Sequence, residues 1–138
     1  MKKEIINKKA NYYYNLVKKY NAGMVLYGKE IKLIRSNKCN ILNAYCKILN
    51  NNIFLLNFKI HNLNNRNIKL LLSKKEILKI YNYIINKNYI IIPTKLFYSL
   101  SGFAKIEIYL SRRKKNNELI NKKKEKELNK KRIKQYYF

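Results

Sequence analysis

The densest group of side chains that could contact a ligand lies near the start of the chain. Three tyrosines, Tyr12–Tyr14, stand there between two lysine pairs, Lys8–Lys9 and Lys18–Lys19. Exposed aromatic rings stack on bases and lysines neutralise phosphates, so this interleaving is typical of a surface that binds nucleic acid. Alternation along a strand would turn about half of these rings toward a core. For each ring the sequence leaves both interpretations open.

Residues for acid–base or nucleophilic catalysis are sparse. The chain has one histidine, His61, in an asparagine-rich loop, and seven acidic residues, all of them glutamate. Only Glu125 and Glu127 are close in sequence, whereas general acid–base catalysis usually needs His or paired carboxylates. No serine has a nucleophile-elbow setting, and no glycine-rich phosphate loop or cofactor motif is present. We therefore predict a protein that is not an enzyme and uses no cofactor.

Metal binding and membrane insertion also find little support in the sequence. Cys39, Cys46 and His61 cannot supply four zinc ligands. Free thiols in a reducing cytosol are the expected state of the two cysteines, although a disulfide stays open at this point. The longest apolar runs, such as Ile90–Ile92, fall far short of the ~20 residues of a membrane span, and Met1–Glu4 leads into no apolar signal core. We predict a cytoplasmic protein without metal.

Charge is the strongest compositional signal. Among 138 residues, Lys and Arg total 32 against 7 acidic residues, for a net charge of +25. Such a field attracts polyanions, with nucleic acid the first expectation and an anionic membrane the second. The chain is also 47% hydrophobic, with 13 Tyr and 5 Phe, which is too apolar for a disordered basic protein. We expect one folded domain whose basic surface binds a polyanion.

Strand patterns dominate the body, residues 1–112. Two turn segments, Asn50–Asn52 and Ser99–Gly102, separate apolar runs at hairpin spacing and predict two antiparallel hairpins. The predicted strands, rich in β-branched, aromatic and aliphatic residues, are Tyr12–Lys19, Asn43–Leu49, Ile53–Ile60, Tyr89–Leu96 and Phe103–Leu110.

Two segments have helical patterns instead. Ser73–Glu76 is a capping box, and the apolar residues that follow it predict a helix to about Asn86. Gly28–Arg35 predicts a shorter helix. A small basic body with these elements fits a mainly β fold with helices, namely an oligonucleotide-binding-like antiparallel β-barrel flanked by two or three α-helices.

The last segment, residues 113–138, is predicted to be a basic C-terminal tail. It has too few aliphatic residues to fold alone. Glu118 with Lys122 and Glu127 with Lys131 are nevertheless favourable i,i+4 helix pairs. We expect a tail that is disordered when free and helical when docked, with a merely solubilising tail as the alternative.

Two blocks of the sequence carry a family resemblance. Asn7–Ala10 with Tyr14, followed by Ala22–Arg35, resembles the opening of the SsrA-binding proteins, also called small protein B. The resemblance covers about residues 7–115. Further matches at the family's spacing are Asn40 with Tyr45, Phe54–Asn57, Lys69–Leu72, Lys75–Ile77, Pro93–Phe97, Gly102–Ile108 and Lys114–Lys115.

The resemblance implies a function. Proteins of this family have an oligonucleotide-binding-like barrel that binds the tRNA-like domain of transfer-messenger RNA and brings the alanyl-charged RNA to stalled ribosomes in trans-translation. The tail then lies in the empty mRNA channel next to the small-subunit decoding centre. The implied partners are transfer-messenger RNA and the ribosome, with the protein a monomer on the RNA and no membrane involved.

The resemblance also implies site residues. Asn21 stands where the family usually has a Glu that contacts RNA, and an amide can still donate and accept hydrogen bonds. In the tail the lysine pair is kept, Glu118 replaces an Asp, and Leu119–Ile120 replace a basic pair. The implied RNA-binding residues are Asn7, Lys8, Lys9, Tyr14, Asn21, Lys69 and Leu71. The implied ribosome-binding residues of the tail are Lys114, Lys115, Asn117, Glu118, Lys122, Lys123 and Lys124.

Two alternatives share part of this pattern. A general ribosomal or single-stranded-RNA-binding protein of the oligonucleotide-binding fold would have the same charge and barrel, but no preference for a tRNA-like RNA and no need for the tail. An RNA-modifying or nucleolytic enzyme would show turnover.

Overall fold

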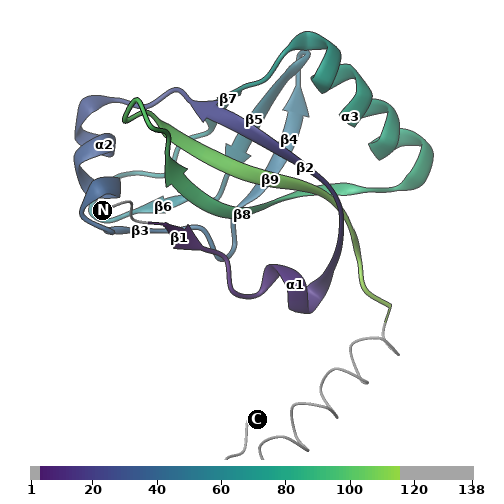
Figure 1. Ribbon diagram of the computed structural model, residues 1–138, viewed down its shortest axis with the longest axis horizontal. Helices are drawn as coiled ribbons and strands as arrows, with labels where there is room; N and C mark the ends of the chain where they lie inside the picture. Colours follow the sequence, from purple (N-terminus) through teal and green to yellow (C-terminus); the bar gives the residue numbers. More distant parts are fainter. Residues whose placement is uncertain (1–3, 116–138) are drawn as a thin grey trace, which may run out of the picture.

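Antiparallel strands dominate residues 4–115, the part of the chain that the computed structural model describes (Figure 1). The elements in chain order are β1 (Ile5–Ile6), α1 (Ala10–Tyr13), β2 (Tyr14–Met24), α2 (Gly28–Arg35), β3 (Cys39–Asn40), β4 (Tyr45–Leu49), β5 (Asn52–Leu56), β6 (Lys59–Ile60), β7 (Ile68–Leu71), α3 (Lys74–Lys87), β8 (Ile90–Tyr98) and β9 (Ala104–Arg113).

The main sheet closes on itself. Its strand order is β1-β8-β4-β5-β7-β2-β9, and β8 also pairs with β9. The ring is therefore complete, because β8 contacts β4 through Cys46 and Ile91 and contacts β9 along most of its length. Closure leaves few unpaired strand edges, which protects a strand-rich chain from aggregation. The structure confirms the predicted antiparallel barrel with flanking helices.

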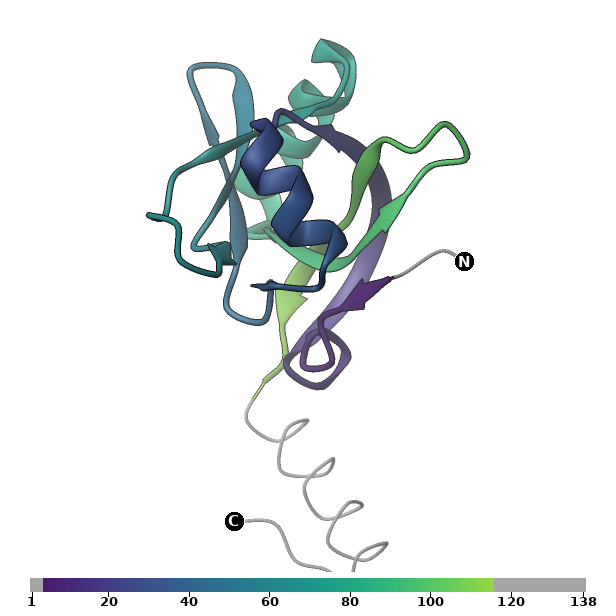
Figure 2. The same ribbon diagram turned by 90° about the vertical axis from the view of Figure 1, so that its left-hand side faces the viewer.

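Two helices lie at opposite ends of this barrel, α2 on the left of Figure 1 and α3 on the right. In Figure 2 α2 lies in front and α3 behind. Helix α2 has the predicted bounds. Helix α3 begins as predicted, because Glu76 N donates to Ser73 Oγ (3.2 Å) while Ser73 N donates to Glu76 Oε1 (3.3 Å). It ends at Lys87, because the next residue, Asn88, has a left-handed φ of 56° that stops the helix.

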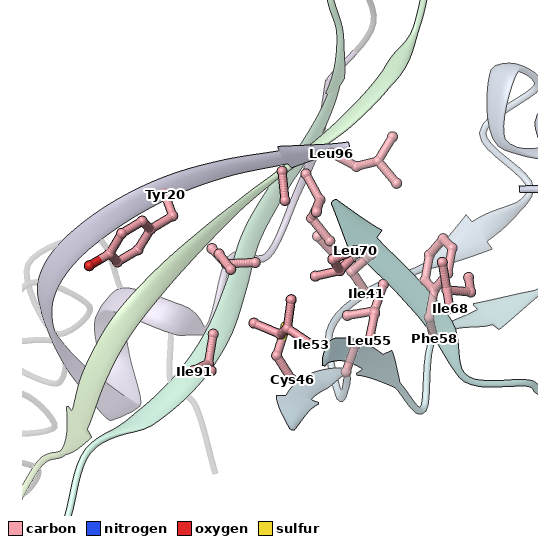
Figure 3. Packing of buried hydrophobic residues seen from close by; sticks show 14 of the residues in the cluster. Tyr20, Ile41, Cys46, Ile53, Leu55, Phe58, Ile68, Leu70, Ile91 and Leu96 are labelled. Atoms are coloured by element: carbon pink, nitrogen blue, oxygen red, sulfur yellow. The ribbon is translucent and has the colours of Figure 1, made fainter. Parts of the chain in front are cut away.

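The barrel interior is filled by side chains from all six ring strands (Figure 3). Alternate residues point inward, as in β7, where Ile68 and Leu70 are buried and Lys69 and Leu71 are exposed. The core is mostly aliphatic, with Phe58 and Tyr20 as its aromatic members. Its largest fully buried side chains are Phe58, Ile34, Ile41, Ile53, Leu55, Ile68, Leu70, Ile80, Leu96, Ile106, Ile108 and Leu110.

The predicted strand Tyr12–Lys19 is wrong at its start. Tyr12 and Tyr13 lie in helix α1, and β2 begins at Tyr14 and continues to Met24. Lys9 O accepts hydrogen bonds from the backbone N–H groups of both Tyr12 and Tyr13 (3.1 Å each). This local turn outweighs the strand preference of tyrosine, which depends on context.

The predicted strand Ile53–Ile60 is divided in two. Asn57 has a left-handed φ of 58°, and its Nδ2 donates to Asn43 O (3.0 Å), so β5 ends before it and the short β6 follows. Strand β7 was not predicted, although Ile68 and Leu70 alternate with exposed residues. A four-residue pattern is too short to distinguish a strand from an apolar segment that precedes helix α3.

Both predicted hairpins are confirmed. Asn50 and Asn51 have φ values of 51° and 62°, the two positive angles of the tight turn that matches strand twist. The second turn, between β8 and β9, uses Gly102 at φ 85°. Within residues 4–115, no helix is long and apolar enough to span a membrane.

Candidate nucleic-acid interface

One group of predicted RNA-binding residues lies at the end of β2 and on its neighbour β7. Leu71 is paired directly with Gly23 of β2, and Asn21 and Lys69 are exposed on the same outer side of the strands. Leu71 is 54% exposed, unusual for a leucine in a sheet. A Cβ on residue 23 would lie 3.3 Å from Leu71 Cδ1, so glycine allows Leu71 to lie across β2. We call Asn21, Gly23, Lys69 and Leu71 the β2–β7 face.

A cavity of about 590 Å³ adjoins this face. It extends from Gly23 and Leu71 to the turn between β8 and β9, where Phe103 is 68% exposed. Arg35 and Lys105 also line it. An exposed ring can stack on a base, and the two neighbouring cations can neutralise the phosphate of the same nucleotide.

An ion pair stabilises the loop next to the same cavity. Glu30, buried at the start of α2, accepts from Arg66 Nη2 (2.6 Å) and from Tyr27 N (2.7 Å), while Arg66 Nη2 also donates to Val25 O (2.9 Å). Burial alone would raise the pKa of Glu30. The hydrogen bonds from Arg66 and Tyr27 and the charges of Arg66 and Lys29 outweigh it, so this pKa lies below its usual value.

A second group of predicted residues surrounds α1, at the other end of β2. Asn7 is buried: its Nδ2 donates to Pro93 O (3.0 Å) and its Oδ1 accepts from Lys9 N (3.2 Å). Its backbone N–H donates to Thr94 O (2.7 Å). Asn7 therefore joins the start of α1 to β8, while Lys8 and Lys9 are exposed beside it.

Lys114 joins the end of β9 to the same helix. Its Nζ donates to Asn11 O (2.6 Å), and its backbone N–H donates to Tyr13 O (3.0 Å). The residue is 8% exposed, whereas Lys115 is exposed. Arg113 pairs with Tyr14 across the sheet. Strand pairing thus continues past residue 112, the predicted end of the body, and Lys114 packs against α1. We call Asn7, Asn11 and Lys114 the α1 anchor.

The structure does not bring all predicted RNA-binding residues into one cluster. Tyr14 opens β2, and Asn21 follows seven residues later in the same strand, which corresponds to ~23 Å at the rise of a strand. A separate cavity of about 540 Å³ lies beside α1, lined by Asn7, Lys9, Tyr14 and Arg113 among others. Asn117, Glu118, Lys122, Lys123 and Lys124 lie outside the described residues.

Sequence reasoning did not single out the turn between β8 and β9, which lines the cavity beside the β2–β7 face. Leu100 is 91% exposed and Phe103 is 68% exposed there, and Arg35 Nη2 donates to Gly102 O (3.3 Å). The sequence did contain a signal for this exposure: the apolar residues Leu100 and Phe103 flank a Ser-Gly turn, where polar residues are usual.

Within the described part of the chain, residues suited to other chemistry are not assembled. His61 is exposed, and both cysteines are free. Burial raises the pKa of Cys39 to about 11, which leaves it an uncharged thiol. Within residues 4–115, no three His, Cys or acidic side chains form a group that could hold a metal ion.

A closed basic barrel with exposed aromatic, amide and lysine side chains on one outer face defines a class, the small nucleic-acid-binding β-barrel proteins. Within that class, the model of the SmpB protein family matches residues 4–137, and the chain belongs to that family. It is 35% identical to the SsrA-binding protein of Thermosipho africanus, with 95% of this chain and 94% of that protein covered. The SsrA-binding protein of Mycoplasma mycoides is 36% identical, with 94% of each covered.

A solved structure supports the same grouping. The chain resembles a protein chain from the structure described as "tmRNA-SmpB: a journey to the center of the bacterial ribosome", with a TM-score of 0.66 and 26% sequence identity. The likeness covers 82% of this chain and 85% of that one.

Proposed function

We propose that this chain binds the tRNA-like domain of transfer-messenger RNA and delivers it to stalled ribosomes for trans-translation. The observation that carries the proposal is family membership across nearly the whole chain, residues 4–137. The likeness to a protein chain solved with transfer-messenger RNA in the ribosome supports the same partners. The protein acts as a monomer in the cytoplasm and performs no chemistry itself, because peptidyl transfer belongs to the ribosome and alanine charging to a synthetase.

The β2–β7 face and the cavity beside it are the proposed contact with the tRNA-like domain. Asn21 supplies hydrogen bonds, Lys69 and Lys105 neutralise phosphates, and Phe103 offers a stacking surface. Leu71 adds apolar contact area. A folded RNA is recognised mainly by shape and by unstacked bases, so a few exposed groups on a rigid barrel are sufficient for specificity.

The α1 anchor has a different role in this proposal. Its polar groups are already hydrogen-bonded within the protein, so Asn7 positions the neighbouring Lys8 and Lys9 rather than contacting RNA. Lys114 fixes the point at which the chain leaves the body. The tail from Lys115 onward then enters the empty mRNA channel, where Asn117, Glu118 and Lys122–Lys124 contact the small subunit and the segment becomes helical.

The test compares the full chain with residues 1–115, because a cut after residue 112 would remove the pairing of Arg113 and the contacts of Lys114. Binding to transfer-messenger RNA is measured at ~150 mM salt against an unstructured RNA of the same length, since salt weakens non-specific binding. Rescue of ribosomes on a non-stop message is measured in parallel. We expect both forms to bind selectively and only the full chain to rescue.

Two results would contradict the proposal. Equal displacement of both RNAs by salt would indicate a general basic RNA-binding protein. Full rescue by residues 1–115 would leave the tail without the proposed role.

A further inference from the structure

A pocket of about 430 Å³ lies between the start of α2 and the loop that joins β6 to β7. Among residues 4–115, it shares no lining residue with the cavity beside the β2–β7 face. Its lining combines three asparagines with one tyrosine and two cations. These residues are Asn62, Asn64, Asn65, Tyr27, Lys29 and Arg66. We call this cavity the α2 pocket.

Tyr27 supplies a flat aromatic surface in the α2 pocket. The residue is 60% exposed, and its backbone N–H donates to Glu30 Oε1 (2.7 Å). The guanidinium carbon of Arg66 lies 4.4 Å from the ring centre, within the range of a cation–π contact. Arg66 therefore packs on the ring, while the exposed part of the ring remains open to a second planar group.

Hydrogen bonds hold Arg66 in place against this ring. Its Nε donates to Glu30 Oε2 (2.9 Å) and its Nη2 donates to Glu30 Oε1 (2.6 Å), a paired contact that fixes the plane of the guanidinium. Nη2 also donates to Val25 O (2.9 Å). The ring and the guanidinium thus form a prearranged platform, which lowers the ordering cost of stacking a ligand on it. Because Glu30 neutralises Arg66, the platform favours a base over a phosphate.

The loop opposite the platform presents amide groups. Its course is fixed at one end, where His61 N donates to Lys38 O (2.9 Å) and Asn62 has a left-handed φ of 61°. The side chains of Asn62, Asn64 and Asn65 are exposed, and within residues 4–115 their amides form no hydrogen bond with the protein. An amide has both donors and an acceptor, and asparagine can form a pair of hydrogen bonds with the edge of adenine.

The α2 pocket lies close to the β2–β7 face. Val25 N donates to Lys69 O (3.0 Å), so the chain that leaves β2 runs beside β7, and Tyr27 follows two residues later. Arg66 precedes Lys69 by only three residues. An RNA bound on the β2–β7 face therefore passes near the pocket, and a base that is not paired within the RNA can enter it.

We propose that the α2 pocket binds one unstacked adenine of the tRNA-like domain, with its ring stacked on Tyr27 and its edge hydrogen-bonded to the loop amides. This inference rests on the proposed function and adds a base-specific contact to it. Unstacked bases of RNA loops are recognised in this way, by aromatic stacking and by hydrogen bonds to their edges. Lys29, exposed in the same pocket, neutralises the phosphate of that nucleotide.

The experiment pairs full-length protein variants with a set of tRNA-like domain RNAs. The variants are Tyr27→Ala, Tyr27→Phe, which keeps the ring, and Tyr81→Ala, which removes a ring that is 45% exposed on α3. Thermal unfolding establishes that each variant folds. In the RNA set each unpaired adenosine is replaced in turn by an abasic nucleotide, and every protein is titrated with every RNA at ~150 mM salt.

For the unaltered RNA we expect Tyr27→Ala to bind about tenfold more weakly than the parent chain, because one stacking contact is lost. Tyr27→Phe and Tyr81→Ala should stay within about twofold. One abasic position should weaken binding by the parent about tenfold and binding by Tyr27→Ala less than about twofold, since the same contact is lost only once. Equal effects of every abasic position on the parent and on Tyr27→Ala would overturn the inference.

A second arm tests the hydrogen bonds to the base edge. At the position that the first arm identifies, the parent should prefer adenine over each other base by at least about fivefold. The double variant Asn64→Ala with Asn65→Ala should lose most of this preference. The control, Asn82→Ala with Asn86→Ala, removes two exposed amides of α3 and should keep it. Preference for another base, or an unchanged preference in the loop variant, would overturn recognition of adenine by the loop.

The two proposals fail in different ways. If the proposed function is wrong, the parent chain does not prefer the tRNA-like domain over an unstructured RNA of the same length. If only the inference is wrong, the parent keeps that preference and Tyr27→Ala binds the tRNA-like domain as tightly as the parent does.

Discussion

The two ends of β2 present predicted RNA-binding residues in opposite ways. At the far end, on the β2–β7 face, Asn21, Lys69 and Leu71 are exposed. At the near end, the side chains of Asn7 and Lys114 are buried and donate to backbone carbonyls of the protein itself. The first end leaves these side chains exposed, and the second uses them to hold α1, β8 and β9 together (Figure 1).

This difference predicts different effects of substitution at the two ends. A buried amide that satisfies two backbone groups is costly to remove, because the groups left behind lose their hydrogen bonds away from water. An exposed ring costs little stability when removed, yet it can carry much of a binding energy. Measurements of stability and affinity on the same variants separate the two cases.

The largest effect is expected for Phe103→Ala. Loss of base stacking on this ring should weaken transfer-messenger RNA binding by about 1–3 kcal/mol, or roughly 5- to 150-fold. The ring is 68% exposed, so the free energy of unfolding should stay within about 0.5 kcal/mol of the parent. Filter binding and thermal unfolding are the measurements. Tyr81→Ala, which removes a ring that is 45% exposed on α3, is the control, and an equal loss of affinity there would refute the assignment.

Asn7→Ala should give the reverse pattern. The change removes the donor to Pro93 O and the acceptor for Lys9 N, and we expect the free energy of unfolding to fall by about 2 kcal/mol. RNA affinity measured well below the unfolding midpoint should change less than in Phe103→Ala. Denaturant unfolding gives the first value and titration the second. If Asn7→Ala abolished binding while stability was unchanged, the amide would be a direct RNA contact.

Local chemistry explains what the sequence predicted well. The Ser73–Glu76 capping box defines the start of α3, and Asn50–Asn51 supply the two positive φ angles of a hairpin. Helix α2 has the predicted bounds for a similar reason, because Tyr27 N donates to Glu30 three residues later. In each case neighbouring residues determine the structure, so a sequence window contains the necessary information.

Long-range contacts explain what the sequence missed. The burial of Asn7 depends on Pro93, which lies 86 residues away, and Lys114 contacts Asn11 across 103 residues. Nothing near Asn7 distinguishes an exposed amide from a buried one. The sequence also placed Phe103 in a strand because of its apolar character. Its exposure depends on how β8 and β9 pair to close the barrel, and a local stretch of sequence does not contain that information.

The smallest expected effect concerns the pH dependence of the ion pair between Glu30 and Arg66, which lies near the β2–β7 face. The pKa of Glu30 is lowered in the folded protein, so the stability that Glu30 contributes is present at neutral pH and is lost as pH falls from its unfolded value of ~4.3 through the lowered folded value. Because Arg66 is partly exposed, solvent screening keeps this loss modest.

Protonation of Glu30 should weaken the contact between Arg66 and Val25 O, next to the contact cavity. Among residues 4–115, no acidic residue lines the cavity beside α1, so that end should not respond. We expect unfolding midpoints and amide chemical shifts near Val25 to move as the pH is lowered from 6 to 3, while shifts near Tyr14, beside α1, stay constant. Glu30→Gln should be less stable at neutral pH and lack this part of the pH dependence, with Glu4→Gln as the control. Equal shifts at both ends of β2 would mean that acid loosens the barrel as a whole, and the two ends would then not be independent.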